Sequence, residues 1–92
     1  MPTLPRSNTP VNITSGTTTQ VATGPGNLYS IVVNTTANGS IKIIDGTSGS
    51  TANIGTLKAS IAEGTYIYDC NFSAGLRIVT AAASDITVNF TQ

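Results

Sequence analysis

Polar and apolar residues alternate along most of the chain, and most regularly between Gly64 and Thr80. In the first half of this stretch every second residue is apolar: Tyr66, Tyr68, Cys70 and Phe72. Alternation with a period of two places such residues on one face of a β-strand. A break at 73–75 then separates this strand from a second one that ends at Thr80. Because aromatic side chains bury large areas, we expect a hairpin here whose aromatic face forms the centre of the core.

Other segments with the same signature are separated by turn residues such as Gly24-Pro25-Gly26. The expected strands are 11–13, 17–23, 27–35, 40–45, 54–60, 66–72, 76–80 and 86–91. The segment 27–35 is apolar on both faces, with Tyr29 on the same face as Ile31, which predicts a central strand. Asn38-Gly39 predicts a hairpin from 27–35 to 40–45, since both residues tolerate positive φ.

About eight short strands with regularly spaced turn signals are typical of an all-β sandwich or barrel. A strand that is apolar on both sides favours two packed sheets over one. We therefore expect a two-sheet sandwich of short antiparallel strands, jelly-roll-like, with an immunoglobulin-like topology as the alternative. The immunoglobulin cysteine pair and tryptophan are absent.

The 92 residues indicate a single domain over 11–92, preceded by an extended arm over 1–10 that contains three prolines. Two interpretations of this arm stay open. It is either a frayed terminus or a segment that becomes ordered against a neighbouring subunit.

The composition argues against most kinds of catalytic and metal-binding site. Charged residues make up 9% of the chain, the net charge is zero, there is no histidine, and Cys70 is the single cysteine. These counts exclude an internal disulfide, a zinc-thiolate cluster, and a catalytic pair that needs imidazole. A nucleic-acid footprint is not expected from four scattered basic residues, and no apolar run is long enough to span a membrane. We expect no catalytic residue, no metal site and no cofactor.

The four acids are spread over separate turns and strands. We expect Asp45 and Asp85 to cap turns, and Asp69 to pair with Arg77 across the aromatic hairpin as a surface bridge. Cys70 is expected to be a small buried hydrophobic residue rather than a reactive thiol.

An ordered set of segments resembles a known group of proteins: Tyr29-Ser30-Ile31-Val32-Val33-Asn34-Thr35, Asp45-Gly46-Thr47, Gly64-Thr65-Tyr66 with Tyr68-Asp69 and Phe72, Gly75-Leu76-Arg77-Ile78-Val79-Thr80, and Asp85-Ile86-Thr87-Val88. Together they resemble the small all-β virion structural proteins of tailed bacteriophages. The resemblance extends from about Val21 to the end of the chain. It implies a non-enzymatic structural component, such as a capsid decoration or cement protein, and supplies no catalytic residues.

The function expected on this basis is capsid decoration, in which copies of the chain, as trimers, bind the major capsid protein on the virion surface and reinforce contacts between capsomers. The protein would be made in the host cytoplasm. Two alternatives are a tail, baseplate or fibre-associated β-domain that binds a host glycan, and a small carbohydrate-active enzyme. The expected partner-binding residues lie in the arm and in the polar loop 47–53: Pro2, Leu4, Pro5, Arg6, Thr47, Ser48, Ser50 and Asn53.

Overall fold

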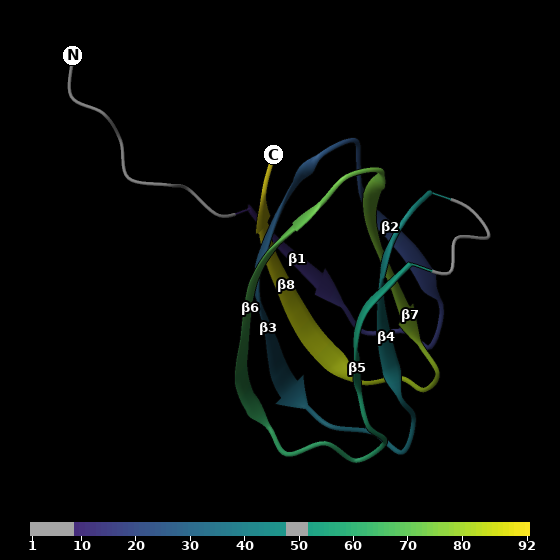
Figure 1. Cartoon of the computed structure of the whole chain (residues 1–92). Helices are drawn as coiled ribbons and strands as arrows, with labels where there is room; N and C mark the ends of the chain where they lie inside the picture. Colours follow the sequence, from purple (N-terminus) through teal and green to yellow (C-terminus); the bar gives the residue numbers. More distant parts are fainter. Residues whose placement is uncertain (1–8, 48–51) are drawn as a thin grey trace.

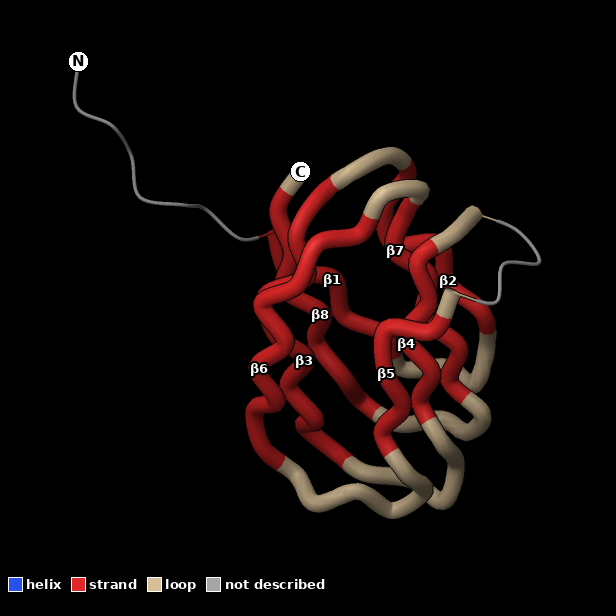
Figure 2. The backbone as a smooth tube through the Cα atoms, in the orientation of Figure 1, coloured by secondary structure: helices blue, strands red, loops and turns tan. Residues whose placement is uncertain are grey.

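The computed structural model describes residues 9–47 and 52–92, and this part of the chain consists of β-strands joined by turns (Figures 1 and 2). The strands are β1 (Thr9–Ile13), β2 (Thr18–Thr23), β3 (Gly26–Thr35), β4 (Ile41–Asp45), β5 (Asn53–Leu57), β6 (Gly64–Phe72), β7 (Gly75–Thr80) and β8 (Asp85–Thr91). Each of the eight expected strands is confirmed. The first begins at Thr9 rather than at Val11, and residues 1–8 of the expected arm lie outside the described residues.

Two four-stranded antiparallel sheets pack face to face. Sheet A has the order β1-β8-β3-β6 and sheet B the order β2-β7-β4-β5; they form the left and right layers of Figure 1. The first strand pairs with the eighth, the second with the seventh, the third with the sixth and the fourth with the fifth. Two further pairings, β3 with β8 and β4 with β7, complete the sheets. This is a jelly roll, which confirms the preferred topology.

The sequence predicted two hairpins, from β6 to β7 and from β3 to β4, and both predictions are wrong. β6 and β7 lie in different sheets, and so do β3 and β4. Only β4 and β5 are both consecutive in the chain and neighbours in a sheet. The short turns at Ser73 and Asn38 therefore carry the chain from one sheet to the other. A tight turn fixes a reversal of direction, but it does not determine which strand supplies the hydrogen bonds.

The core lies between the two sheets and is mainly aliphatic. Its central strands are β3 and β8 of sheet A and β7 and β4 of sheet B. The completely buried side chains are Leu28, Ile31, Ile43, Leu76, Ile78, Ile86 and Val88. Burial of such side chains contributes about 1.5–3 kcal/mol each relative to exposure. The aromatic strand β6 is at the edge of sheet A, so it borders this core instead of occupying its centre.

The aromatic face of β6 does point inward, as the alternation predicted. Phe72 is buried, while Tyr66, Tyr68 and Cys70 are half-buried and pack against the core. Tyr68 closes the side of the sandwich by packing on Gly55 of β5. A Cβ atom at Gly55 would lie 2.9 Å from the Tyr68 Cε1 atom, so the contact requires glycine. The Tyr66 hydroxyl donates a hydrogen bond to the Ala62 carbonyl.

A bulge changes which residues of β3 face the core. Leu28 lies opposite Cys70, but Ser30 lies opposite Ile67, so Tyr29 sits where the register shifts. The partner strand accommodates the shift with Asp69, whose φ is +46°. On the other side of β3, Leu28 and Ser30 pair with the consecutive residues Phe90 and Asn89 of β8, so Tyr29 is an extra residue of β3 and the alternation reverses beyond it. As a result Tyr29 is 38% exposed, and the prediction that it shares the inward face of Ile31 is wrong.

Thr80 is a buried polar residue that fixes the turn between β1 and β2. Its side chain is 3% exposed. The hydroxyl accepts a hydrogen bond from the Thr17 N–H at 3.0 Å and lies 2.6 Å from the Ser15 carbonyl, to which it donates. Thr80 thus satisfies two backbone groups of a connection that crosses between the sheets.

We expect Thr80→Val to lower the free energy of unfolding by about 1–3 kcal/mol, because it keeps the side-chain shape but leaves backbone groups without partners. Urea denaturation measures the change. Thr18→Val is the matched control, because Thr18 is an exposed strand residue, and its effect should stay within about 0.5 kcal/mol. Equal losses in the two variants would contradict a structural role for the Thr80 hydroxyl.

Candidate functional site

The outer face of sheet A, which we call face A, is polar, and the acids Asp69 and Asp85 are the charged side chains of its strands. Strand register aligns its side chains in rows: Ile67, Ser30 and Asn89 form one row, and Thr65, Val32 and Thr87 form the next. Pro10 and Asn12 of β1 extend these rows at the far edge. Asparagine, threonine and serine therefore dominate the face, and two hydrophobic residues lie among them.

Two large hydrophobic side chains are exposed among the described residues, and both lie on face A. Ile67 is 58% exposed and Tyr29 is 38% exposed. They are near neighbours, because Ile67 lies opposite Ser30, the residue that follows Tyr29. Single exposed hydrophobic residues are common, but adjacent ones on a flat sheet face are a feature of interaction surfaces.

Side-chain hydrogen bonds hold the polar part of face A in a defined arrangement. The Asn12 amide donates to an Asp85 carboxylate oxygen at 2.7 Å, and the Asn34 amide donates to the Thr87 hydroxyl at 3.1 Å. The Asn89 amide donates to the Ser30 hydroxyl at 3.0 Å. A surface whose side chains are already ordered loses less conformational entropy on binding.

The outer face of sheet B, which we call face B, has the opposite charge. Lys42 of β4 and Arg77 of β7 both point outward, on the two central strands of the sheet. Half-buried aliphatic residues lie beside them, since Val79 is opposite Lys42 and Ile44 is opposite Arg77. The Arg77 Nη1 atom donates to the Thr47 carbonyl at 2.9 Å. The pairing of β4 with β7 thus brings together two cations that look scattered in the sequence.

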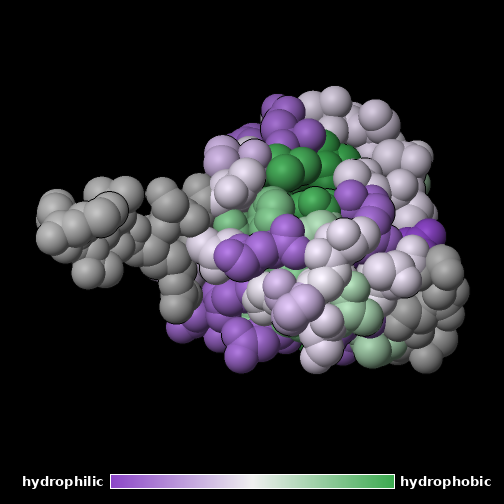
Figure 3. Space-filling view, turned by 90° about the horizontal axis from the view of Figure 1, so that it is seen from above, coloured by the Kyte–Doolittle hydropathy of each residue, from purple (hydrophilic) through white to green (hydrophobic). Residues whose placement is uncertain are grey.

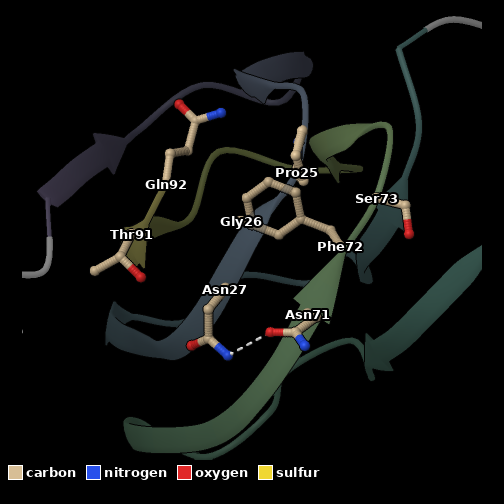
Figure 4. Close-up of a pocket in the computed structure, with 8 residues that line it drawn as sticks. All are labelled: Pro25, Gly26, Asn27, Asn71, Phe72, Ser73, Thr91 and Gln92. Atoms are coloured by element: carbon tan, nitrogen blue, oxygen red, sulfur yellow. Dashed lines mark hydrogen bonds between the residues drawn. The ribbon is translucent and has the colours of Figure 1, made fainter.

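An open pocket of about 540 Å³ lies at the end of the sandwich where β6 ends and β3 begins. Figure 3 looks onto this end and shows hydrophobic atoms bordered by hydrophilic ones. Figure 4 shows the lining residues: Pro25, Gly26, Asn27, Asn71, Phe72, Ser73, Thr91 and Gln92. None of them is titratable near neutral pH, so the pocket holds no group for acid–base catalysis.

Within this pocket the Asn27 amide donates to the Asn71 side-chain carbonyl at 3.1 Å (Figure 4). The Asn27 Oδ1 atom is buried and has no hydrogen-bond partner among the described residues. Gly26 has no space for a side chain, because a Cβ atom there would lie 2.5 Å from both the Phe72 ring and the Thr91 carbonyl. The pocket is therefore a packed strand end with amide groups at its rim.

Asp45 binds the turn between β6 and β7. Its carboxylate accepts hydrogen bonds from the N–H groups of Ser73 at 2.9 Å, Ala74 at 2.8 Å and Gly75 at 3.3 Å. These bonds, with Ser73 and Ala74 the strongest, lower the pKa of Asp45 below its ordinary value. The expectation that Asp45 caps a turn is confirmed, although the turn is 28 residues away in sequence.

The other acids are held in separate places. Asp85 accepts hydrogen bonds from the amides of Asn12 and Asn34, and Glu63 accepts one from the Thr36 N–H. Asp69 is on β6 in sheet A and Arg77 is on β7 in sheet B, so the expected cross-strand pair is wrong. Among the described residues, no three His, Cys, Asp or Glu side chains come together as a metal site would require.

The half-buried Cys70 thiol and Tyr68 hydroxyl are both poor reactive groups. Burial, and secondly the charge of Asp69, raise the pKa of Cys70. Burial, and secondly Cys70, raise the pKa of Tyr68. Because the thiolate is the nucleophilic form, a raised pKa keeps Cys70 protonated at neutral pH and unreactive. This agrees with the expectation of a packing role for Cys70.

Of the expected partner-binding residues, only Thr47 and Asn53 lie within the described part of the chain; Pro2, Leu4, Pro5, Arg6, Ser48 and Ser50 lie outside it. Both described residues are exposed. The Asn53 amide faces the Ile43 and Gly55 carbonyls and the Thr56 hydroxyl, and so stabilises the irregular pairing of β4 with β5. A partner-binding role for these residues stays a prediction.

No family model and no curated protein matches the chain. A search of solved structures finds the core of NLP from Drosophila, described for its pentamer formation and histone binding. The chain shares 13% sequence identity with it, the match covers 92% of this chain and 97% of the other, and the TM-score is 0.59. At this identity the likeness establishes a common fold.

The predicted role in capsid decoration is wrong on this finding. The Drosophila NLP core, which shares the fold over nearly its whole length, is described for pentamer formation and histone binding, and this points away from a phage capsid and from the major capsid protein as a partner. The segments that suggested bacteriophage virion proteins are strands and turns of a jelly roll, a fold used for many functions. The virion location, which depended on that role, has no support in the comparisons.

The described residues contain no helix that is long and apolar enough to cross a membrane.

We expect the stabilising effect of Asp45 to depend on pH. Its pKa is lowered in the folded state, so its contribution is fully present above the unfolded value of about 4 and is lost as pH falls through the lower folded value. The difference in unfolding free energy between wild type and Asp45→Asn should therefore be constant near neutral pH and shrink in acid. Urea denaturation at roughly pH 2–7, a range that extends on both sides of the unfolded value, measures it. A difference that does not change with pH would contradict the carboxylate's role.

Proposed function

We propose that this protein is a non-enzymatic structural subunit that self-associates into a homo-oligomer through the outer faces of its jelly roll. The observation that carries the proposal is the exposed pair Ile67 and Tyr29 on the flat, hydrogen-bonded face A. Burying an exposed isoleucine side chain contributes about 1.5–3 kcal/mol, and an aromatic neighbour adds to the apolar area.

Low charge supports the same proposal. A chain with four acidic and four basic residues and a net charge of zero has little electrostatic repulsion between copies. The aligned arrangement of Asn12, Asn34 and Asn89 supplies hydrogen-bonding groups that are already ordered. These features favour association of like subunits over binding of a strongly charged partner.

The comparison also supports an assembled state. Because the jelly roll of the Drosophila NLP core forms a pentamer, we propose a ring of five copies here in place of the trimer expected from the sequence. We do not propose histone binding for this chain. A strongly basic partner is attracted by a concentration of acidic residues, and this chain has only four, of which Asp45 is engaged with a backbone turn.

We expect sedimentation velocity and native mass spectrometry of the full chain to detect an oligomer at micromolar concentration. Ile67→Lys should weaken association by about tenfold or more, because it removes the exposed apolar side chain and places a charge at the contact. Ala59→Lys adds the same charge at an exposed position between β5 and β6 and should have no effect. A wild-type protein that is monomeric at all concentrations would overturn the proposed function.

A further inference from the structure

The two outer faces of the sandwich differ in charge. Face A carries the acids Asp69 and Asp85, and none of the described lysines or arginines lies on it. Face B carries Lys42 and Arg77 on its two central strands. Association of two identical faces would place like charges opposite each other, whereas contact between face A and face B pairs opposite charges.

Each of the two faces also has hydrophobic residues close to its charged residues. Ile67 is exposed on face A and Asp69 follows it two positions later on the same strand. On face B, Val79 and Ile44 lie beside Lys42 and Arg77. Each face therefore combines an apolar centre with a charge, and the two charges have opposite sign.

From this complementarity, and resting on the proposed self-association, we infer that face A of one copy docks on face B of the next, so that the contact is head-to-tail and not two-fold symmetric. The occupant of each face is thus a second copy of this chain. Ile67 and Tyr29 supply the buried apolar area, while Lys42 and Arg77 determine the orientation.

The two faces lie on opposite sides of the sandwich, because each is the outer face of one of its two sheets. Ile67 lies on β6, the edge strand of sheet A, whereas Lys42 and Arg77 lie on central strands of sheet B. Contact between Ile67 and these cations would place the edge strand of one sandwich over the central strands of the next. A head-to-tail contact with a constant rotation closes into a ring when the rotations sum to a full turn.

Two single variants test the head-to-tail contact. Ile67→Lys introduces a positive charge on face A, which would be repelled by the cations of face B. Lys42→Glu introduces a negative charge on face B, which would be repelled by the acids of face A. We expect each variant alone to associate about tenfold or more weakly than wild type in sedimentation velocity. Lys58→Glu makes the same charge change at an exposed residue just after β5 and is the matched control, expected to assemble normally.

Mixing the two variants is the decisive experiment. A head-to-tail contact predicts that the mixture regains association, because the intact face A of one variant meets the intact face B of the other. Native mass spectrometry should then find a heterodimer with one copy of each variant, because only one intact contact can form between the two. If face A binds face A instead, Lys42→Glu assembles alone and excludes Ile67→Lys from its complexes, which would overturn the inference. In that case wild-type self-association would persist, so the proposed homo-oligomer would stand and the ring of five would not.

Discussion

The structure depends on burial of aliphatic side chains between two sheets that are each apolar on one face only. Neither sheet is stable with its inner face in water, so the chain must cross repeatedly between them. Ile31, Ile86 and Val88 from sheet A meet Ile43 and Ile78 from sheet B in a core that excludes solvent. The edge strand β6 then closes one side of this core, where Tyr68 packs on Gly55.

Repeated crossing has a cost, because each crossing turn leaves backbone groups that no neighbouring strand can satisfy. Side chains distant in sequence supply the missing partners. Thr80 holds the turn between β1 and β2, and Asp45 holds the turn between β6 and β7. Near the second turn, the Gln20 amide donates to the Ala22 carbonyl at 2.8 Å and the Gly46 carbonyl at 2.9 Å. These polar contacts hold the two sheets together at the ends of the strands, and the aliphatic core holds them together at the centres of the strands.

With the inner faces committed to the core, the outer faces are available for recognition. The hydrogen-bonded amides of face A, the exposed Ile67 and the cations of face B form a surface suited to other copies of the chain. The fold is shared with the Drosophila NLP core, and this chain has four acidic and four basic residues. Asp45, Glu63 and Asp85 also accept hydrogen bonds from backbone N–H groups or side-chain amides.

The sequence by itself determined the strands, because alternation with a period of two is a local property: Tyr66 to Phe72 and Ile86 to Phe90 have the inward faces that it predicts. Local signals also identified Asp45 as a turn cap. The sandwich followed from the number of strands and from the apolar character of 27–35.

Only the tertiary structure decided which strands are neighbours. The pairing of β3 with β6 and β8, rather than with β4, depends on contacts between residues far apart in sequence, which no turn signal encodes. The bulge that exposes Tyr29 and the grouping of Lys42 with Arg77 arise from that pairing, since both depend on register between strands. The candidate faces were therefore hidden in the sequence. Alternation predicted the outward direction of Ile67 and Lys42, but it gave the wrong direction for Tyr29 and no information on which residues are neighbours on the surface.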